Sequence, residues 1–333
     1  MEIIRLNHAS VQDEKLACDQ FAVDVLTGLC STPKKISSKY FYNDLGSKLF
    51  QQITHHEDYY LTRIEHAILS AAASEIPQHF THDAVDIVEL GVGDGHKTKL
   101  IIDGFLSRGI KVQFFPVDIS AQAMLLLEKN YPSHPKLNIF AIVGEYLDAL
   151  KYLRDRSMNP QLLLFLGSNI GNFDRVQNQG FLSLLRRNMQ PRDRLLIGFD
   201  LKKDVQVLTR AYNDSAGITR EFNLNILRRI NEELGANFCL HSWDHFGSYN
   251  PILGAMESFL LPDKPQEVYI AQLQRSFSFA AYEPIHLEYS FKYLMTDIDF
   301  LCCNTGFVPI THYQDEQRWF VDSLWQPEAD ENV

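Results

Sequence analysis

Three glycines at alternate positions follow an apolar segment in the stretch VELGVGDGHKTKL, residues 88–100. Gly91, Gly93 and Gly95 would let the backbone approach a ligand closely, because glycine has no side chain and tolerates left-handed backbone. A phosphate-binding loop of the GxxxxGK[ST] type needs a glycine where His96 stands. The dinucleotide-binding pattern GxGxxG needs a glycine at the same position. His96 therefore weighs against both of these nucleotide sites.

Acidic residues end three successive segments with the pattern of buried strands. Glu89 lies near the end of VDIVEL, Asp118 ends VQFFPVD, and Glu145 ends LNIFAIVGE. The pattern Glu-x-Gly-x-Gly-x-Gly, from Glu89 to Gly95, resembles motif I of class I methyltransferases, which hold S-adenosyl-L-methionine. In such a fold Asp118 would accept hydrogen bonds from the two ribose hydroxyls, and Glu145 would lie at the adenine. The alternative is that Asp118 and Glu145 only cap the helices after their strands.

Strand-like and helix-like segments alternate through the middle of the chain. Apolar strands are expected at 85–90, 112–118, 137–145, 160–168 and 193–200, and helices at 97–108 and 120–131. This alternation predicts a parallel sheet covered on both faces, an α/β doubly wound fold of the Rossmann-like, class I methyltransferase type. A further helix is expected over roughly 63–79, because Thr62 and Glu65 have the spacing of a capping box.

The alternating pattern gives way at about residue 202 to an amphipathic helix, EFNLNILRRINEEL, and mixed strands. We therefore expect two domains. Residues 63–204 and 285–333 would form the S-adenosylmethionine-binding methyltransferase domain. Residues 1–62 and 205–284 would form a second, α+β domain that binds the substrate.

Composition excludes several classes of partner. The chain of 333 residues has a formal net charge of −11 and no run of basic residues, which weighs against nucleic acid as a partner. It has five cysteines and no CxxC pair. With no signal-peptide pattern and no long apolar run, we expect a cytoplasmic monomer without a membrane partner. His241 and His245 lack the glutamate and third ligand of a zinc site, so no metal is expected.

Five segments carry a more specific resemblance. They are KYFYNDLGSKLFQQITHHEDYYLTRIE, VELGVGDGHKT, LLLFLGSNIGNF, RAYNDSAGITREFNLNILRRIN and HLEYSFKY, and their order matches from about residue 35 to the C-terminus. Together they resemble the histidine-specific Nα-methyltransferase family of ergothioneine biosynthesis. The resemblance implies that three methyl groups pass from S-adenosyl-L-methionine to the α-amino nitrogen of L-histidine, giving hercynine.

Other functions stay open beside this one. A related methyltransferase could act on an imidazole nitrogen of histidine or on another aromatic amino acid. A nucleotide-binding regulator could have kept the fold and lost the chemistry, although the intact glycine pattern and Asp118 weigh against that class.

The resemblance implies a substrate site built from several motifs. Tyr59 and Asn172 would hold the amino group as catalytic residues, Tyr212 would bind the carboxylate, and Gly167 would lie near the transferred methyl group. The structural alternatives are that both tyrosines are ordinary half-buried aromatics and that Asn172 caps the helix after its strand.

The same resemblance places the imidazole. Glu288 and Ser290 would contact the ring, Tyr42 would lie close to it, and Phe222 would line the pocket. Ser258 stands where an apolar residue such as methionine is common in the family, which affects the size of the pocket. An unpaired carboxylate inside a strand is costly, so Glu288 is the assignment least easily explained by structure alone.

The resemblance and the glycine motif together imply seven residues that bind the cofactor. One of them departs from the family pattern, since Glu145 stands where many members carry aspartate. The expected cofactor-binding residues are Glu89, Gly91, Gly93, Lys97, Asp118, Glu145 and Tyr146.

Overall fold

The computed structural model describes residues 1–6, 11–119, 124, 127, 130–154, 156 and 159–329. The chain forms two compact units, each of which is described by itself. The first comprises Met1–Asn7, Leu61–Lys202 and Phe291–Val333, and the second His8–Tyr60 and Lys203–Ser290.

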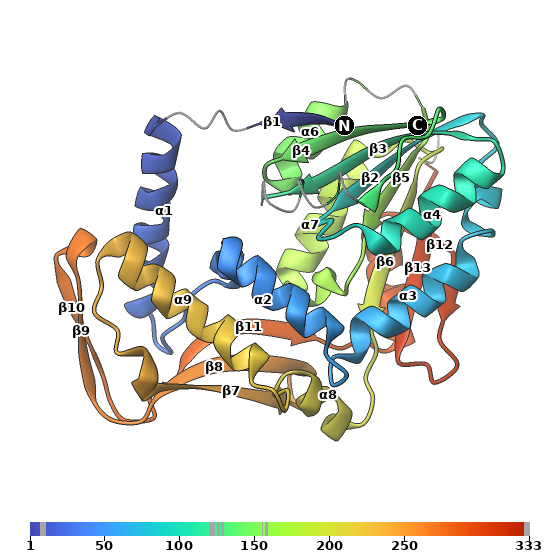
Figure 1. Ribbon diagram of the computed structural model, residues 1–333. Helices are drawn as coiled ribbons and strands as arrows, with labels where there is room; N and C mark the ends of the chain where they lie inside the picture. Colours follow the sequence, from blue (N-terminus) through green and yellow to red (C-terminus); the bar gives the residue numbers. More distant parts are fainter. Residues whose placement is uncertain are drawn as a thin grey trace. The chain divides into compact units, whose positions relative to one another are not determined.

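The first unit is built on an eight-stranded sheet (Figure 1). Its neighbouring strands are, in order, β1 (Glu2–Arg5), β4 (Leu137–Val143), β3 (Lys111–Asp118), β2 (Ala84–Leu90), β5 (Gln161–Phe165), β6 (Arg194–Asp200), β13 (Phe320–Pro327) and β12 (Phe307–Gln314). The strands from β1 to β6 pair in parallel, whereas β13 runs antiparallel to both of its neighbours. This order places the carboxyl ends of β2 and β5 side by side.

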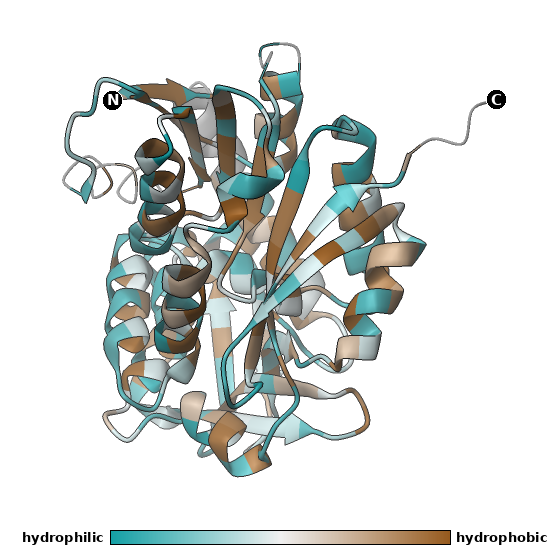
Figure 2. Cartoon of the chain, turned by 90° about the vertical axis from the view of Figure 1, so that its right-hand side faces the viewer, coloured by the Kyte–Doolittle hydropathy of each residue, from teal (hydrophilic) through white to brown (hydrophobic). Residues whose placement is uncertain are grey.

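Helices cover both faces of this sheet. One apolar cluster joins the strands to α3 (Tyr60–Ala72) and α4 (His96–Ser107), and includes the buried Leu69 and Phe105. The other joins them to α6 (Tyr146–Arg154), α7 (Arg175–Asn188) and α10 (Met295–Asn304). In Figure 2 the helices are banded in hydrophobic and hydrophilic colours, as expected where one helix face lies on a core. The predicted doubly wound α/β fold is confirmed.

Individual elements differ from the expectation in informative ways. The helix expected over 63–79 begins at Tyr60, before the supposed capping box, and ends at Ala72. A short 3-10 helix, η2 (Ile76–His79), follows, where Pro77 is incompatible with a continuing α-helix. The helix expected over 120–131 lies mostly outside the described residues.

The second unit combines helices with small antiparallel sheets. A three-stranded sheet has the order β11 (Ile285–Phe291), β8 (Ala255–Pro262) and β7 (Trp243–Asn250), and β9 (Gln266–Ile270) pairs with β10 (Arg275–Phe279). The helices are α1 (Val11–Leu29), η1 (Ser38–Phe41), α2 (Asp44–His55), α8 (Val205–Ala211), α9 (Ile218–Leu234), η4 (Leu240–Ser242) and η5 (Ala271–Leu273). Helix α9 packs on both α2 and β7, and its Leu227 and Ile230 are fully buried in the core of this unit.

Two strands lie outside the boundaries expected from the sequence. β1 falls within the expected substrate domain but pairs with β4 in the large sheet. β11 begins where the methyltransferase domain was expected to resume, yet it belongs to the three-stranded sheet. A strand pattern identifies a strand and not its neighbours, so these pairings could not be foreseen. The division into cofactor-binding and substrate-binding domains stays a proposal.

Within the described residues, none of the helices has both the length and the apolar character needed to cross a membrane.

A fully buried ion pair joins the end of β6 to the residue after β11. Lys292 Nζ lies 2.8 Å from Asp200 Oδ2, and both side chains are 0% exposed. The Tyr293 N–H also donates to the carbonyl oxygen of Asp200 at 3.0 Å. Removing one partner of such a pair leaves an uncompensated charge in the interior, which is strongly destabilising.

Replacing this lysine by an apolar residue should therefore destabilise the protein. Lys292→Met is expected to lower the free energy of unfolding by roughly 3–5 kcal/mol, measured by urea unfolding. The double variant Lys292→Met/Asp200→Leu removes both charges and should recover much of that loss. A single variant that unfolds at the same urea concentration as wild type would contradict the interpretation.

Candidate active site

The loop Gly91–Gly95, called the glycine loop below, connects β2 to α4 through left-handed backbone. Its three glycines have φ values of 77°, 57° and 70°. A Cβ on the first of them would lie only 2.6 Å from the Tyr146 hydroxyl oxygen. At Gly93, by contrast, no heavy atom of the described residues lies within 4 Å of the same position. Gly93 is therefore the place where the loop leaves room for a ligand.

Polar side chains at or after the carboxyl ends of β3, β4 and β5 lie near the glycine loop. The Gly93 N–H points to Asp118 Oδ2 at 3.4 Å. Asn169 follows β5, and its Nδ2 would lie 3.3 Å from a Cβ at Gly91. Burial, and then the charges of Asp118 and Glu145, raise the pKa of Tyr146, which keeps its hydroxyl protonated. Asp118 and Tyr146 thus gather at the glycine loop, as does Asn169, which the sequence analysis missed.

The two remaining strand-end acids differ in environment. Glu145 is exposed. Glu89 is 2% exposed, and its Oε2 has no hydrogen-bond partner among the described residues. Burial raises the pKa of Glu89 to about 8 against an ordinary value of 4.5. At neutral pH this carboxyl group is therefore mostly protonated, and a nearby cation would favour its ionised form.

A second left-handed turn follows β5. Gly167 and Ser168 have φ values of 77° and 56°. The Gly167 N–H donates to Glu65 Oε1 at 2.6 Å, and Glu65 also pairs with Lys97. Burial alone would lower the pKa of Lys97, but the Glu65 carboxylate outweighs it and raises that pKa. Lys97 and Gly167 are thus brought together by Glu65, which the sequence analysis had assigned to a helix cap.

Asn172 is the last residue of the 3-10 helix η3 (Asn169–Asn172). The next helix, α7, is capped by Asp174, whose side chain accepts from the Gln177 N–H at 2.8 Å. The alternative that Asn172 caps this helix is therefore wrong, and its assignment to the substrate stays a proposal.

In the second unit, three of the expected substrate residues gather around one phenylalanine. The ring centroid of Phe50 lies 5.6 Å from Tyr42, 5.8 Å from Phe222 and 6.4 Å from Tyr59. Tyr42 and Phe222 also meet edge to face at 5.7 Å. Phe50 was not predicted as a site residue, although its ring contacts all three of these predicted ones.

Two other expected substrate residues, Tyr212 after α8 and Ser290 on β11, meet at the three-stranded sheet. The hydroxyls of Tyr212 and Ser290 are 2.6 Å apart in a hydrogen bond. His245 Nε2 lies 2.8 Å from the Tyr212 carbonyl oxygen, and burial lowers the pKa of this histidine. Glu288 lies two residues before Ser290 on β11 and is half-buried, while Ser258 is buried on the adjacent strand β8. His245 therefore supports the backbone of Tyr212.

Asp58 connects the segments that carry the two expected tyrosines. Its Oδ2 accepts from the Ser215 N–H at 3.1 Å and from the Ser215 hydroxyl at 3.2 Å. Asp58 directly precedes Tyr59, and Ser215 follows Tyr212 by three residues. The contact thus keeps the two segments together within this unit.

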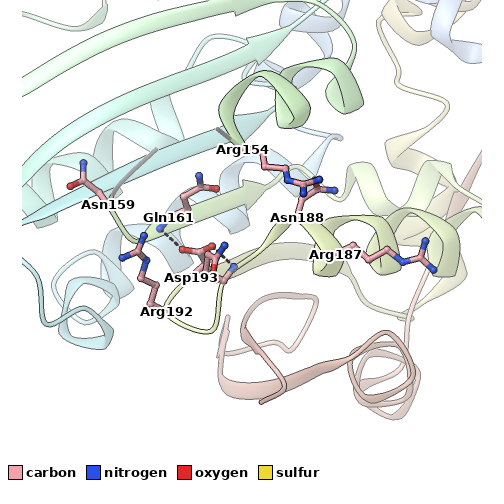
Figure 3. A pocket seen from close by; sticks show the side chains of 8 residues that line it. Arg154, Asn159, Gln161, Arg187, Asn188, Arg192 and Asp193 are labelled. Atoms are coloured by element: carbon pink, nitrogen blue, oxygen red, sulfur yellow. Dashed lines mark hydrogen bonds between the residues drawn. The ribbon is translucent and has the colours of Figure 1, made fainter. Parts of the chain in front are cut away.

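A separate pocket lies at the amino ends of the strands of the large sheet, and none of the predicted site residues lines it (Figure 3). It is lined by arginines and amides around Asp193, whose carboxylate accepts from the N–H groups of Gln161 and Gln190. Because Gln161 begins β5, this pocket lies at the amino end of the strand. Ligands of open parallel sheets bind at the carboxyl ends, so this pocket is not the candidate site.

The strand order and the glycine loop together define a class of protein. Seven strands in the order β4-β3-β2-β5-β6-β13-β12, with β13 antiparallel, form the sheet of a class I methyltransferase dependent on S-adenosylmethionine. The residues fit that cofactor: Gly93 leaves open space, Asp118 offers a carboxylate beside it, and Glu89 holds a buried oxygen without a partner.

Comparison with known proteins identifies the family within the class I methyltransferases to which the chain is similar. The model of a family described as histidine-specific, S-adenosylmethionine-dependent methyltransferases matches residues 21–327. A histidine N-alpha-methyltransferase of Mycolicibacterium smegmatis is 36% identical over 83% of this chain and 85% of its own. One of Mycobacterium tuberculosis is 34% identical over 90% and 93%. Ergothioneine biosynthesis protein 1 of Neurospora crassa is 31% identical over 84% of this chain and 32% of its own.

The chain belongs to the family of histidine-specific, S-adenosylmethionine-dependent methyltransferases.

The open position at Gly93 can be tested by adding one methyl group. Gly93→Ala is expected to weaken S-adenosylmethionine binding by about tenfold or more, or ~1.4 kcal/mol, because the methyl occupies ligand space. Isothermal titration calorimetry measures the change. Left-handed backbone should also cost about 1–2 kcal/mol of stability.

Gly217 provides a matched control, because it has a φ of 73° and also no heavy atom of the described residues within 4 Å of a Cβ. Gly217→Ala should lose similar stability and keep its cofactor affinity. Equal affinities for the two variants would show that Gly93 does not face the cofactor.

The raised pKa of Glu89 predicts a pH dependence of stability. Between about pH 4.5 and pH 8 the folded protein holds a proton on Glu89 that the unfolded chain has released. The folded state binds more protons, so the contribution of Glu89 makes stability fall as pH rises through this range. Glu89→Gln, which stays neutral, should gain stability relative to wild type from pH 5 to pH 8. Thermal unfolding across this range checks it, and a constant difference in Tm would contradict it.

Proposed function

We propose that the protein transfers three methyl groups from S-adenosyl-L-methionine to the α-amino nitrogen of L-histidine, giving hercynine, a step of ergothioneine biosynthesis. The observation that carries the proposal is the match to the histidine-specific family over residues 21–327. Relatives named histidine N-alpha-methyltransferase support it, because each aligns with most of the chain.

On the cofactor side, we propose that the glycine loop and Asp118 hold the nucleoside and that Lys97 and Glu89 address the charged methionine part. The contact between Gly93 and Asp118 supports the first assignment. The buried, partnerless oxygen of Glu89 supports the second, because a cation would stabilise its ionised form. Glu145 and Tyr146 would complete the adenosine site.

On the substrate side, we propose that Tyr212 binds the carboxylate and that Glu288 and Ser290 contact the imidazole. The hydrogen bond between the hydroxyls of Tyr212 and Ser290 supports a shared site. The aromatic group of Tyr42, Phe50, Tyr59 and Phe222 would provide an apolar wall. Tyr59 and Asn172 would hold the amino group, and Gly167 would lie near the transferred methyl group.

S-adenosylmethionine supplies a methyl group bonded to a sulfonium, which an amine can displace directly. In each transfer the new N–C bond would form as the C–S bond breaks and S-adenosylhomocysteine leaves. The nitrogen would give up one proton to water before each of the three attacks, so the final quaternary ammonium has no N–H left. The amine must be neutral, because an ammonium has no lone pair. The protein must hold that lone pair in line with the breaking bond, about 3 Å from the carbon. Tyr59 and Asn172 would orient the amine through hydrogen bonds.

Three successive transfers constrain these contacts. Each methyl group replaces one N–H, so hydrogen bonds to the amine disappear one by one. Affinity must therefore reside mainly in the contacts to the carboxylate and the imidazole.

We further propose that the enzyme is monomeric and cytoplasmic and that it does not act on nucleic acid. A formal net charge of −11 supports the last of these proposals.

Glu288→Ala tests the assignment of the imidazole. Loss of the carboxylate leaves the ring N–H without its partner, at a cost of about 1–3 kcal/mol. The kcat/KM for histidine should fall by roughly tenfold to a hundredfold, and turnover of tryptophan relative to histidine should rise. Labelled cofactor, a panel of amino acids and NMR identification of the methylated atom provide the measurement.

Glu267→Ala is the matched control, since Glu267 is an exposed glutamate on β9 of the same unit. It should leave the ratio of histidine to tryptophan turnover unchanged. The same ratio in wild type and Glu288→Ala would exclude Glu288 from the pocket. Methylation at an imidazole nitrogen in the wild type would replace the proposed reaction with its alternative.

A further inference from the structure

One buried carboxylate connects the two loops at the carboxyl ends of β2 and β5. Glu65 lies on α3 and is 0% exposed. Its Oε1 accepts from the Gly167 N–H at 2.6 Å, in the loop after β5. Its Oε2 pairs with Lys97 Nζ, which follows the glycine loop after β2. Glu65 therefore links the first turn of α4, directly after the glycine loop, to the loop after β5.

A glycine in the large sheet makes room for the Glu65 carboxylate. The Glu65 side chain packs against Gly198 on β6, where a Cβ would lie 2.4 Å from Glu65 Oε1. The ring of Phe320 on β13 would lie 3.0 Å from the same Cβ. Any other residue at position 198 would displace the carboxylate, so the position of Glu65 is determined by the sheet as well as by its own helix.

A second buried acid lies next to the ion pair of Glu65 and Lys97. This acid, Asp322, lies opposite Gly198 in the pairing of β13 with β6. Burial, and after it the negative charge of Glu65, raises the pKa of Asp322 well above its ordinary value. Asp322 thus lies beside the carboxylate of Glu65 on the neighbouring strand, and the ion pair of Glu65 with Lys97 is the contact that links α3 to α4.

The ion pair of Glu65 and Lys97 lies at the position in the sheet where proteins with open parallel sheets bind their ligands. Along the sheet, β3 and β4 lie on one side of β2, while β5 and β6 lie on the other. The connections therefore diverge between β2 and β5, and open parallel sheets bind ligands in the crevice at such a point. The Lys97 ammonium has three N–H donors, of which Glu65 accounts for one.

We propose that Glu65 is a positioning residue for the methyl donor, which it serves by fixing Lys97 and the Gly167 N–H on the two sides of the cofactor crevice. The inference rests on the proposed function, because it requires that S-adenosylmethionine binds in this crevice. Glu65 acts through Lys97 and Gly167 and does not itself contact the reacting atoms.

The test compares isosteric neutralisation of two buried acids in the full chain. Glu65→Gln keeps an acceptor for Gly167 but loses the charge that orients Lys97. Its Kd for S-adenosylmethionine and for S-adenosylhomocysteine should rise roughly tenfold, as expected for loss of a hydrogen bond to a charged group. The KM for histidine at saturating cofactor should change less than twofold. Asp193→Asn, a buried acid at the amino end of β5, and the exposed Glu75→Gln are the buried and surface controls, and both should bind the cofactor within twofold of wild type.

A double-mutant cycle with Lys97→Gln distinguishes positioning from a general effect on folding. If Glu65 acts through Lys97, Glu65→Gln/Lys97→Gln should bind no more weakly than Lys97→Gln alone. Additive losses would overturn the inference. If Glu65→Gln does not fold, the double variant, which lacks both buried charges, still permits the comparison with Lys97→Gln.

Two failures are distinguishable. An unchanged cofactor Kd in folded Glu65→Gln, with normal binding by wild type, would overturn this inference alone. Wild-type protein that binds neither S-adenosylmethionine nor S-adenosylhomocysteine would overturn the proposed function, and this inference with it.

Discussion

The chain leaves β2 and β5 through left-handed backbone, and the chemistry of the first unit depends on these two turns. A left-handed turn at a strand end directs backbone N–H groups and short side chains to the edge of the sheet without a Cβ in the way. The glycine loop accepts this conformation at little cost. Ser168 is not a glycine, and its hydroxyl accepts from the Asp200 N–H at 3.1 Å, which holds the strained residue in place.

Much of the large sheet follows from local sequence. Buried parallel strands are continuous apolar runs, so the strands expected at 85–90, 160–168 and 193–200 are all found, with ends that differ by at most three residues. The identity of neighbouring strands is set by long-range pairing, which local patterns do not contain. For this reason β1 was not expected beside β4, and β11 was not expected in a separate sheet.

For the site, too, local sequence predicts some residues, while others depend on contacts between distant segments. Asp118 and the glycine loop could be predicted, because they follow strands whose carboxyl ends must share one edge. Tyr146 was implied only by the resemblance to a known family. The resemblance to a known family supplied Tyr212 and Ser290, which meet in a hydrogen bond. Glu65 was missed because its spacing to Thr62 matched a helix cap, and only the packing of α3 on the sheet directs its side chain to Lys97. Asn169 and Phe50 lie within recognised motifs, but sequence does not reveal which of several polar or aromatic neighbours points inward.

The late position of β13 in the chain has a consequence for biosynthesis. β6 gains its antiparallel neighbour only from residues 320–327, which the ribosome adds after the whole of residues 203–290. Until then the apolar strand β6 ends the parallel sheet with an open row of N–H and C=O groups, a template for pairing with another chain. Pairing between such distant segments is also slow. A nascent chain therefore has this edge of β6 unpaired until residues 320–327 have been made, and an unpaired strand edge favours aggregation.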